Sequence, residues 1–348
     1  MRMLKRGRTL PAGFTLLPVV LAMSLIGAIA FMLNRDNGLN SNLIGSQSDL
    51  ARARYAAEAG LQAVNYAIQA LGCAGSYPIS SSPVTDSNFD GAAYSAYANN
   101  TSGSPLTLTS TGTYNGASAT LTKTSAYVYQ PGVRTWVTQP GPATGKDTYV
   151  QDNNPSKNYG GSQKLILNKN VGIFGSEVLL QFDLSPLPAG SRVVPWYDVV
   201  LGLRPGAIVS LYQQSVGVSQ NDFLAKLITR SWVAGTQDGG SPANGATWNT
   251  YDGVNNWPSP GVGYDPRELL RVPEDTAGWL DIGLTDAVLA WMSGVYPNHG
   301  VWLDPNGFDP DGRAKNYEFH SSDYMGDASL RPKFTAYYLL PCGATAPA

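Results

Sequence analysis

The chain has 348 residues, of which 14% are charged, with a net charge of −2 and two cysteines. The net charge is close to zero, whereas nucleic-acid-binding proteins commonly carry a strongly basic surface, so no nucleic-acid partner is expected. The 38 glycines, 24 prolines and 19 tyrosines favour a turn-rich, aromatic-rich β protein. The length exceeds one typical domain and predicts more than one folded part.

The N-terminal residues predict a membrane anchor. Residues 1–13 form a basic leader without acidic side chains, which is typical of the cytoplasmic side of a membrane. Residues 14–33 carry no charge, and as a helix they would span roughly 30 Å, the thickness of a bilayer core. The rest of the chain is therefore expected outside the cytoplasm.

The order of residues around Gly13 separates this leader from an ordinary secretory signal, whose small-residue cleavage site follows the apolar run. Here Gly13 precedes it, and the segment resembles the N-terminus of type IV prepilins and pseudopilins. The resemblance implies cleavage between Gly13 and Phe14 by a prepilin peptidase and N-methylation of Phe14. Pro18 stands where most members have Glu, and this departure favours a minor, tip-located subunit.

The anchor is expected to continue as a helix over residues 14–72. The Asn-rich stretch 34–42 contains poor helix formers and predicts a kink. From Ser46 to Leu71 apolar residues recur every three or four positions, and Gly72 is expected to end the helix. Residues 51–61 also resemble the segment after the anchor in PilX-type minor pilins, which implies helix contacts with other pilin subunits.

Residues 73–130 predict a small pilin-like β head. Two β-rich runs, 106–114 and 118–128, flank Asn115-Gly116, a dipeptide that favours a tight hairpin turn. The following Pro- and Gly-rich residues 131–145 are interpreted as a linker.

Residues 146–341 predict an antiparallel β-sandwich or jelly roll, with one helix at 285–292. The expected fold class is therefore α+β, with a long N-terminal pilin-like helix and a small β-hairpin region before an all-β domain. The β-rich part resembles the DNRLRE family, also treated as a carbohydrate-binding module. That resemblance implies a polysaccharide or host-surface partner, and it rests on residues 147–152, 158–160, 179–185, 247–249, 298–300 and 319–322.

Three aromatic residues in the turn-rich stretch 234–262 are candidates for ligand binding: Trp248, Tyr251 and Trp257. Flat rings can stack on the C–H faces of sugars. The alternative is that these rings are buried and hold a long loop in place, as aromatic residues commonly do.

A loop with several oxygen ligands follows the run His299–Leu303. Asp304, Asn306, Asp309 and Asp311 offer the hard oxygen atoms that Ca²⁺ prefers. Their spacing is not that of an EF-hand, and Asp and Gly are also common in ordinary turns. A calcium ion bracing this loop and a metal-free turn both remain open.

Cys73 and Cys342 are the only cysteines, and in an exported chain they are expected to pair. His299 and His320 are the only histidines, and the sequence contains no nucleophile elbow or metal-binding helix motif. A non-catalytic protein is therefore expected.

Together these features predict a minor subunit of a type IV pilus or pseudopilus that displays an adhesive, carbohydrate-binding module. It would lie in the inner membrane before assembly, and afterwards be extracellular in a pilus or periplasmic in a pseudopilus. Two alternatives remain: a membrane-anchored surface binding protein outside any filament, and a structural initiator of assembly.

Overall fold

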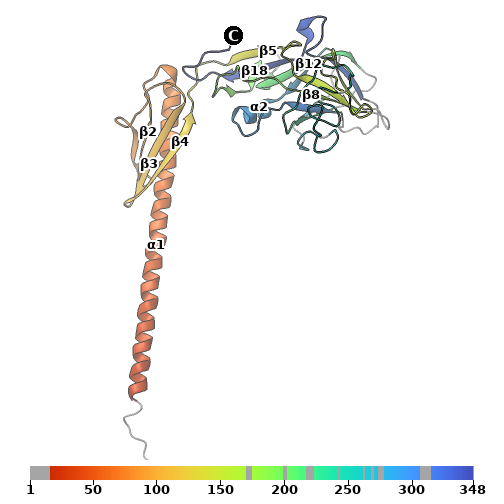
Figure 1. Cartoon of the computed structure of the whole chain (residues 1–348). Helices are drawn as coiled ribbons and strands as arrows, with labels where there is room; N and C mark the ends of the chain where they lie inside the picture. The colour runs from red at the N-terminus through yellow and green to blue at the C-terminus, as the bar shows by residue number, and fades with distance from the viewer. Residues whose placement is uncertain are drawn as a thin grey trace, which may run out of the picture. The chain divides into compact units, whose positions relative to one another are not determined.

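The structure, a computed structural model, describes residues 16–169, 175–198, 202–216, 223–241, 243–261, 263–267, 270–272, 278–305 and 315–347. The chain forms two compact units, Met1–Ser102 with Leu106–Ala126, and Gly103–Pro105 with Tyr127–Ala348. The first unit contains one long helix and a small sheet, and the second is rich in strands (Figure 1). The α+β class with a β-rich second part is confirmed.

Unit 1 packs helix α1 (Leu16–Leu71) against an antiparallel sheet ordered β1-β2-β3-β4. The short turn η1 (Gly72–Ala74) ends the helix at the predicted place. The predicted hairpin is also confirmed, because Asn115 and Gly116 join β3 and β4 with φ values of 47° and 81°. The strands are β1 (Val84–Phe89), β2 (Ala92–Ala98), β3 (Leu106–Tyr114) and β4 (Ala117–Ala126).

The helix of unit 1 approaches its sheet closely because both surfaces carry small residues. Ala53, Ala56 and Ala57 are buried on the helix. A Cβ atom placed on Gly112 of β3 would lie 2.0 Å from the Ala53 carbonyl oxygen, so only glycine fits there. The predicted kink at residues 34–42 is wrong, since α1 continues through them. Weak helix propensity costs only a fraction of a kcal/mol per residue and need not end a helix.

The N-terminal half of α1 exposes large apolar side chains. Within the described residues, no helix has a stretch long and apolar enough to cross a bilayer. Gly13, Phe14 and the side chain of Pro18 lie outside the described part of the chain. The exposed apolar residues include Met23, Leu25, Ile26, Ile29 and Met32.

Unit 2 is built on one large antiparallel sheet whose main path is β14-β13-β16-β8-β7-β17-β12-β18-β5. Three further strands join it: β15 pairs with β12, β6 with β8 and β9 with β18, while β10 and β11 form a separate pair. The strands before the helix are β5 (Arg134–Thr138), β6 (Asp147–Gln151), β7 (Lys164–Lys169), β8 (Gly175–Leu180), β9 (Arg192–Val193), β10 (Trp196–Asp198), β11 (Gly202–Arg204), β12 (Ala207–Val216), β13 (Phe223–Leu227), β14 (Leu270–Val272) and β15 (Gly278–Gly283). Helix α2 (Thr285–Met292), β16 (Val301–Asp304), β17 (Lys315–His320), η2 (Ala328–Leu330) and β18 (Lys333–Leu339) follow.

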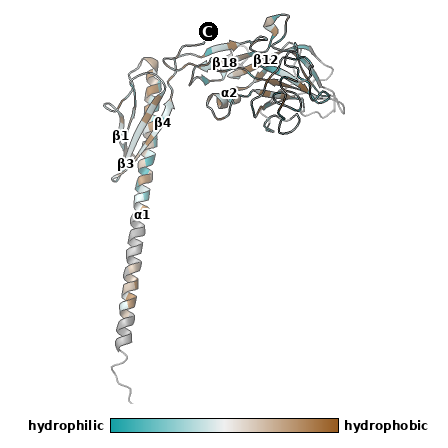
Figure 2. Cartoon of the chain, in the orientation of Figure 1, coloured by the Kyte–Doolittle hydropathy of each residue, from teal (hydrophilic) through white to brown (hydrophobic). Residues whose placement is uncertain are grey.

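The large sheet folds back on itself, as in a sandwich. The rings of Phe223 in β13 and Tyr317 in β17 lie 5.5 Å apart, although β16, β8 and β7 separate these strands along the sheet. One hydrophobic core fills the space between the facing layers. Figure 2 shows the hydrophobic colouring on strands of this unit. Helix α2 has the predicted limits and contributes Ala287 and Val288 to the core.

The predicted linker 131–145 contains a strand of unit 2. Residues 134–138 form β5, which pairs with β18 so that Trp136 lies opposite Ala336. Trp136 is buried against Phe334. The interpretation of this stretch as a linker is therefore wrong. The strand is short and lies between turn-rich residues, and its partner strand lies near the C-terminus, so the local sequence does not reveal it.

A long segment, residues 229–264, covers the outer face of the sheet and forms a second hydrophobic cluster. Trp232 and Trp257 of this segment pack with Leu179 of β8 and Trp302 of β16. The opposite faces of β8 and β16 contribute to the main core. These two strands are therefore buried on both faces, which explains why their apolar residues do not alternate with polar ones.

Candidate functional site

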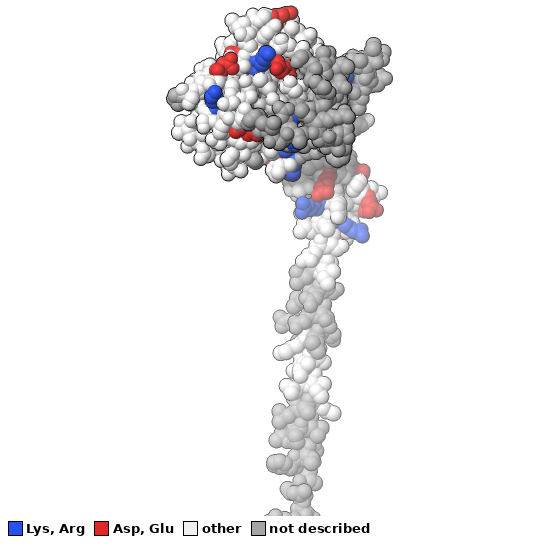
Figure 3. Space-filling view, turned by 90° about the vertical axis from the view of Figure 1, so that its right-hand side faces the viewer, with Lys and Arg blue, Asp and Glu red and all other residues white. Residues whose placement is uncertain are grey.

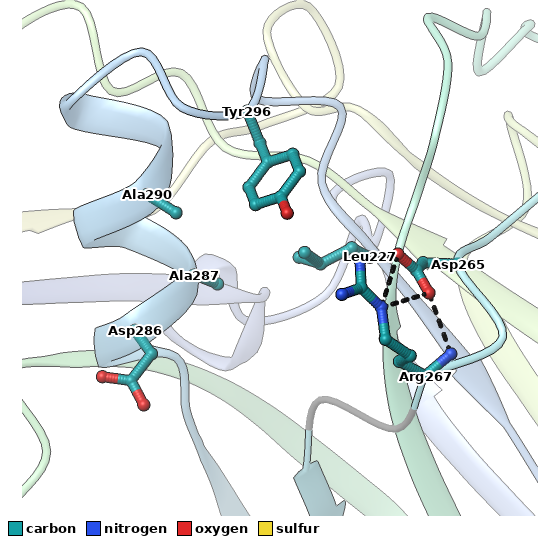
Figure 4. Close-up of a pocket in the computed structure, with 7 residues that line it drawn as sticks. All are labelled: Leu227, Asp265, Arg267, Asp286, Ala287, Ala290 and Tyr296. Atoms are coloured by element: carbon teal, nitrogen blue, oxygen red, sulfur yellow. Dashed lines mark hydrogen bonds and ion pairs between the residues drawn. The ribbon is translucent and has the colours of Figure 1, made fainter. Parts of the chain in front are cut away.

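A cavity of about 280 Å³ opens beside α2 in unit 2 (Figure 4). Ala287 and Ala290 of the helix line one side, and the ion pair of Asp265 and Arg267 lies across from them. The ring of Tyr296 lies between the two sides. Leu227 and Asp286 complete the lining. The cavity thus combines one aromatic ring, small apolar residues and charged groups.

Backbone hydrogen bonds hold the Asp265 side of the cavity. The Asp265 N–H donates to the Leu227 carbonyl at 2.8 Å, which ties the loop to the end of β13. The Asp265 carboxylate accepts the Arg267 backbone N–H at 2.9 Å and its Nε at 3.0 Å. The Arg267 Nη2 donates to Asp265 Oδ2 at 2.5 Å. The loop therefore presents the guanidinium in a fixed orientation.

The end of α2 positions Tyr296. Gly294 follows the helix with φ +74°, the left-handed conformation that commonly ends a helix. The Val295 and Tyr296 N–H groups then donate to the Ala290 carbonyl at 3.0 and 3.3 Å. Tyr296 is 43% exposed, so its ring remains accessible to a ligand.

The ion pair keeps the charges of the cavity fixed over a wide pH range. Hydrogen bonds from Arg267 lower the pKa of Asp265 to about 2. Hydrogen bonds to Asp265 and Tyr296 raise the pKa of the exposed Arg267 guanidinium above its ordinary value. The cavity thus offers hydrogen-bond donors and acceptors whose ionisation does not change near neutral pH.

This combination of groups fits an uncharged polar ligand with an apolar face. Ligand sites commonly pair apolar walls with a few well-placed polar groups. A sugar presents C–H groups that can stack on the Tyr296 ring, and its hydroxyls can donate to Asp265 or Asp286 and accept from Arg267.

A second cavity of about 230 Å³ lies beside the C-terminal part of α2. Its lining includes Pro188, Gly190, Trp291, Met292 and Asn298. The Asn298 side-chain amide nitrogen donates to the Phe182 carbonyl at 2.9 Å, and the Asn298 backbone carbonyl accepts from Gln181 Nε2 at 2.9 Å. None of its described lining residues is charged, so these residues offer fewer groups for recognising hydroxyls than those of the first cavity.

The sequence-predicted aromatic residues do not line either of these cavities. Trp257 is only 3% exposed, and its Nε1 donates to the Thr247 carbonyl at 2.9 Å. The expectation that Trp257 contacts a ligand is therefore wrong in this structure. Trp248 and Tyr251 are partly buried against the same cluster, and Gly261 packs onto the Trp248 ring. This supports the alternative that the rings hold the long loop in place.

The predicted calcium ligands are not brought together in the described part of the chain. Asp304 is 1% exposed, and its Oδ2 accepts from Lys226 Nζ at 2.6 Å. Asn306, Asp309 and Asp311 lie outside the described residues. Among the residues that are described, no group of three or more His, Cys, Asp or Glu side chains could hold a metal ion. Asp304 therefore has a protein partner, Lys226.

The contacts of the two cysteines and the two histidines point to structural roles. Neither cysteine is a free thiol, and the Cys342 N–H donates to the Val128 carbonyl at 2.8 Å. His320 is buried between the rings of Tyr212 and Tyr324, and burial lowers the pKa of its imidazole. The His299 carbonyl accepts from Trp232 Nε1 at 2.8 Å.

Sequence reasoning missed the cavity residues because they come from three separate segments. Asp265-Pro266-Arg267 forms a turn, Tyr296 precedes a proline, and Leu227 ends a strand. The only local signal is an aromatic residue in the exposed Val295-Tyr296-Pro297 turn. No local sequence pattern shows that these turns lie together beside α2.

Residues 135–197 match the family described as Carbohydrate-binding module family 96. No curated protein matches the chain. The matched stretch runs from β5 into β10 and supplies β6, β7 and β8 of the large sheet. On the face shown in Figure 3, charged side chains of both signs are few and scattered among uncharged ones. The comparison supports a carbohydrate-binding-like β-sandwich in unit 2.

Proposed function

We propose that unit 2 binds a carbohydrate and that the cavity beside α2 is its binding site. The match to a carbohydrate-binding module family within the β-sandwich carries this proposal. The cavity adds an exposed aromatic ring beside an ion pair, which are the groups needed for C–H faces and hydroxyls. Since such modules bind without catalysis, the proposed role is attachment to a polysaccharide or host surface.

We further propose that the chain displays this module as a minor, tip-located subunit of a type IV pilus or pseudopilus. The N-terminal sequence supports this, as does a long helix packed on a small antiparallel sheet in unit 1. Apolar residues exposed on α1 need a lipid or protein partner, and neighbouring pilin helices would supply one. The inner membrane would hold the subunit before assembly.

A glycan array probed with the full-length protein in detergent tests the carbohydrate proposal. Binding to one glycan class, competed by the same soluble sugar, is expected. Absence of binding to all glycans by folded protein would favour a structural initiator of assembly.

The N-terminal residue tests the filament proposal separately. Mass spectrometry of protein from its native host should show N-methylated Phe14 only when the prepilin peptidase is present. An intact Met1 end would favour a membrane-anchored surface binding protein, and it would leave the carbohydrate proposal unaffected.

A further inference from the structure

Three ionisable side chains lie together inside unit 2, and none of them is among the described residues that line the cavity beside α2. Lys226, Asp304 and Glu177 are 8%, 1% and 4% exposed. They belong to β13, β16 and β8, which are consecutive in the sheet. Burying charges costs several kcal/mol per ion unless each is paired. Neither of the proposed functions uses this cluster.

The strand register places the three side chains on one face of the sheet. Leu224 lies opposite Asp304 and Lys226 opposite Trp302, so Lys226 and Asp304 are diagonal neighbours. The pairing of β16 with β8, continued by one residue, places Glu177 opposite Asp304. Residues opposite each other in an antiparallel pair share a face. This is the outer face, which the segment 229–264 covers.

The contacts within the cluster are short and shielded by aromatic rings. Lys226 Nζ lies 2.6 Å from Asp304 Oδ2. Trp302 Nε1 donates to Glu177 Oε2 at 2.5 Å. The Lys226 ammonium also lies 4.1 Å from the centre of the Tyr264 ring. An amine, a carboxyl group and a second carboxyl group are therefore held together with little access to water.

The protonation states suit proton transfer within the cluster. Burial, reinforced by the nearby charge of Asp304, raises the pKa of Glu177 well above its ordinary value, which favours the neutral acid form of this side chain. Burial lowers the pKa of Lys226, but the hydrogen bond to Asp304, the charge of Asp304 and the contact with Tyr264 together outweigh burial, and the net pKa is raised. Lys226 and Asp304 thus start as an ion pair beside a carboxyl group whose neutral form is favoured.

We propose that Lys226 and Asp304 join in an intramolecular amide bond, with Glu177 transferring the protons, so that β13 and β16 become covalently linked. A proton first passes from Lys226 Nζ to Asp304 Oδ2 along their hydrogen bond. The neutral amine attacks the Asp304 Cγ, Glu177 donates its proton to the developing oxyanion, and Glu177 then takes a proton from the nitrogen. One hydroxyl leaves as water, and the carbonyl re-forms.

The step balances without any other reactant. One ammonium and one carboxylate become one amide and one water, and Glu177 returns to its neutral form. The product replaces two buried charges by a neutral group, which removes their desolvation cost. Holding the two groups in contact also makes the reaction effectively unimolecular, which can contribute many orders of magnitude in rate.

Peptide mapping of the reduced, full-length protein tests this proposal. We expect one branched peptide that contains both Lys226 and Asp304, whose mass is that of the two separate peptides minus one water. Trypsin should not cleave after Lys226, because its amine is acylated. Complete recovery of two unlinked peptides from folded protein would overturn the proposal.

Two variants distinguish the bond from a persistent ion pair. Lys226→Arg keeps a positive charge beside Asp304 and should give only unlinked peptides. In Asp304→Asn, amide formation with Lys226 should release ammonia in place of water. The branched peptide should have the same mass as the one from the wild type.

The role of Glu177 is tested by Glu177→Gln, with circular dichroism showing that the variant is folded. We expect the branched peptide to be absent or to form at least tenfold more slowly. Formation at the wild-type rate in folded Glu177→Gln protein would rule out Glu177 as the proton-transferring group.

Discussion

At the scale of single residues, buried polar groups organise unit 2 by satisfying one another. Asn158 is fully buried, and its amide nitrogen donates to the carbonyls of Ala234 and Ala246 at 2.7 and 2.9 Å. Its side-chain oxygen accepts from the backbone N–H groups of Gly160 and Gln237. One amide thus fastens the outer segment to the sheet. The same residue belongs to the sequence pattern that resembles the DNRLRE family, so that pattern has a structural explanation here.

Asp147 should make the stability of unit 2 depend on pH. Burial raises the pKa of Asp147 to about 7, although its carboxylate accepts from the Ser322 N–H and hydroxyl at 2.9 and 3.0 Å. The folded protein then holds a proton that the unfolded chain releases above about pH 4. The free energy of unfolding should therefore fall between pH 4 and 7, by about 4 kcal/mol or less.

Replacing this carboxyl group separates its contribution from those of other acids. In Asp147→Asn, urea unfolding at several pH values should show a smaller loss of stability from pH 4 to 7 than in the wild type. Ser156→Ala, which changes an exposed residue of unit 2, is a control that should keep the wild-type slope. Equal slopes in wild type and Asp147→Asn would contradict this assignment.

At the scale of elements, close approach between backbones decides the packing of unit 1. Gly112 lies where the helix crosses β3, and Gly60 of α1 lies against Tyr94 and Ser110. At these two positions a side chain would collide with neighbouring atoms. The apolar face of the helix was recognised from its spacing, but the glycine that packs against it on β3 was not, because a single glycine in a strand has no periodic signal.

Gly112→Val should destabilise unit 1 by about 2–4 kcal/mol, since the new side chain must displace the α1 backbone. The matched control is Thr113→Val, which introduces the same side chain at the next, exposed position of β3 and should change stability by less than about 0.5 kcal/mol. Thermal unfolding of both variants measures the difference. Equal melting temperatures for the two would contradict the close packing described here.

The elements that the sequence predicted are those with local signals. The β3–β4 hairpin has its turn dipeptide, and α2 has an apolar helical stretch between turns. Strand β5 was missed because Trp136 is fixed by a partner near the C-terminus. The exposure of Trp257 was predicted wrongly. The composition of the segment around it shows that the segment is rich in turns, but it does not show that the segment packs onto the sheet.

At the scale of the whole molecule, the chain joins a helical unit to a β-sandwich, and its two cysteines belong to different units. Neither cysteine is free. We predict a Cys73–Cys342 disulfide that links the units covalently, which suits a protein carried outside the cytoplasm. Peptide mapping without reductant should recover the two cysteine-containing peptides as one species. Rapid alkylation of both cysteines in unreduced protein would contradict this pairing.

Carbohydrate recognition beside α2 is the central claim of this account, and the affinity of the full-length protein for the glycan that it selects on an array tests it most directly. Tyr296→Ala removes the exposed ring of the cavity and should weaken binding at least tenfold, equivalent to about 1.4 kcal/mol. Val254→Ala, at an 81% exposed position of the outer segment, should bind like the wild type. Unchanged affinity in folded Tyr296→Ala protein would contradict the claim and place the glycan elsewhere.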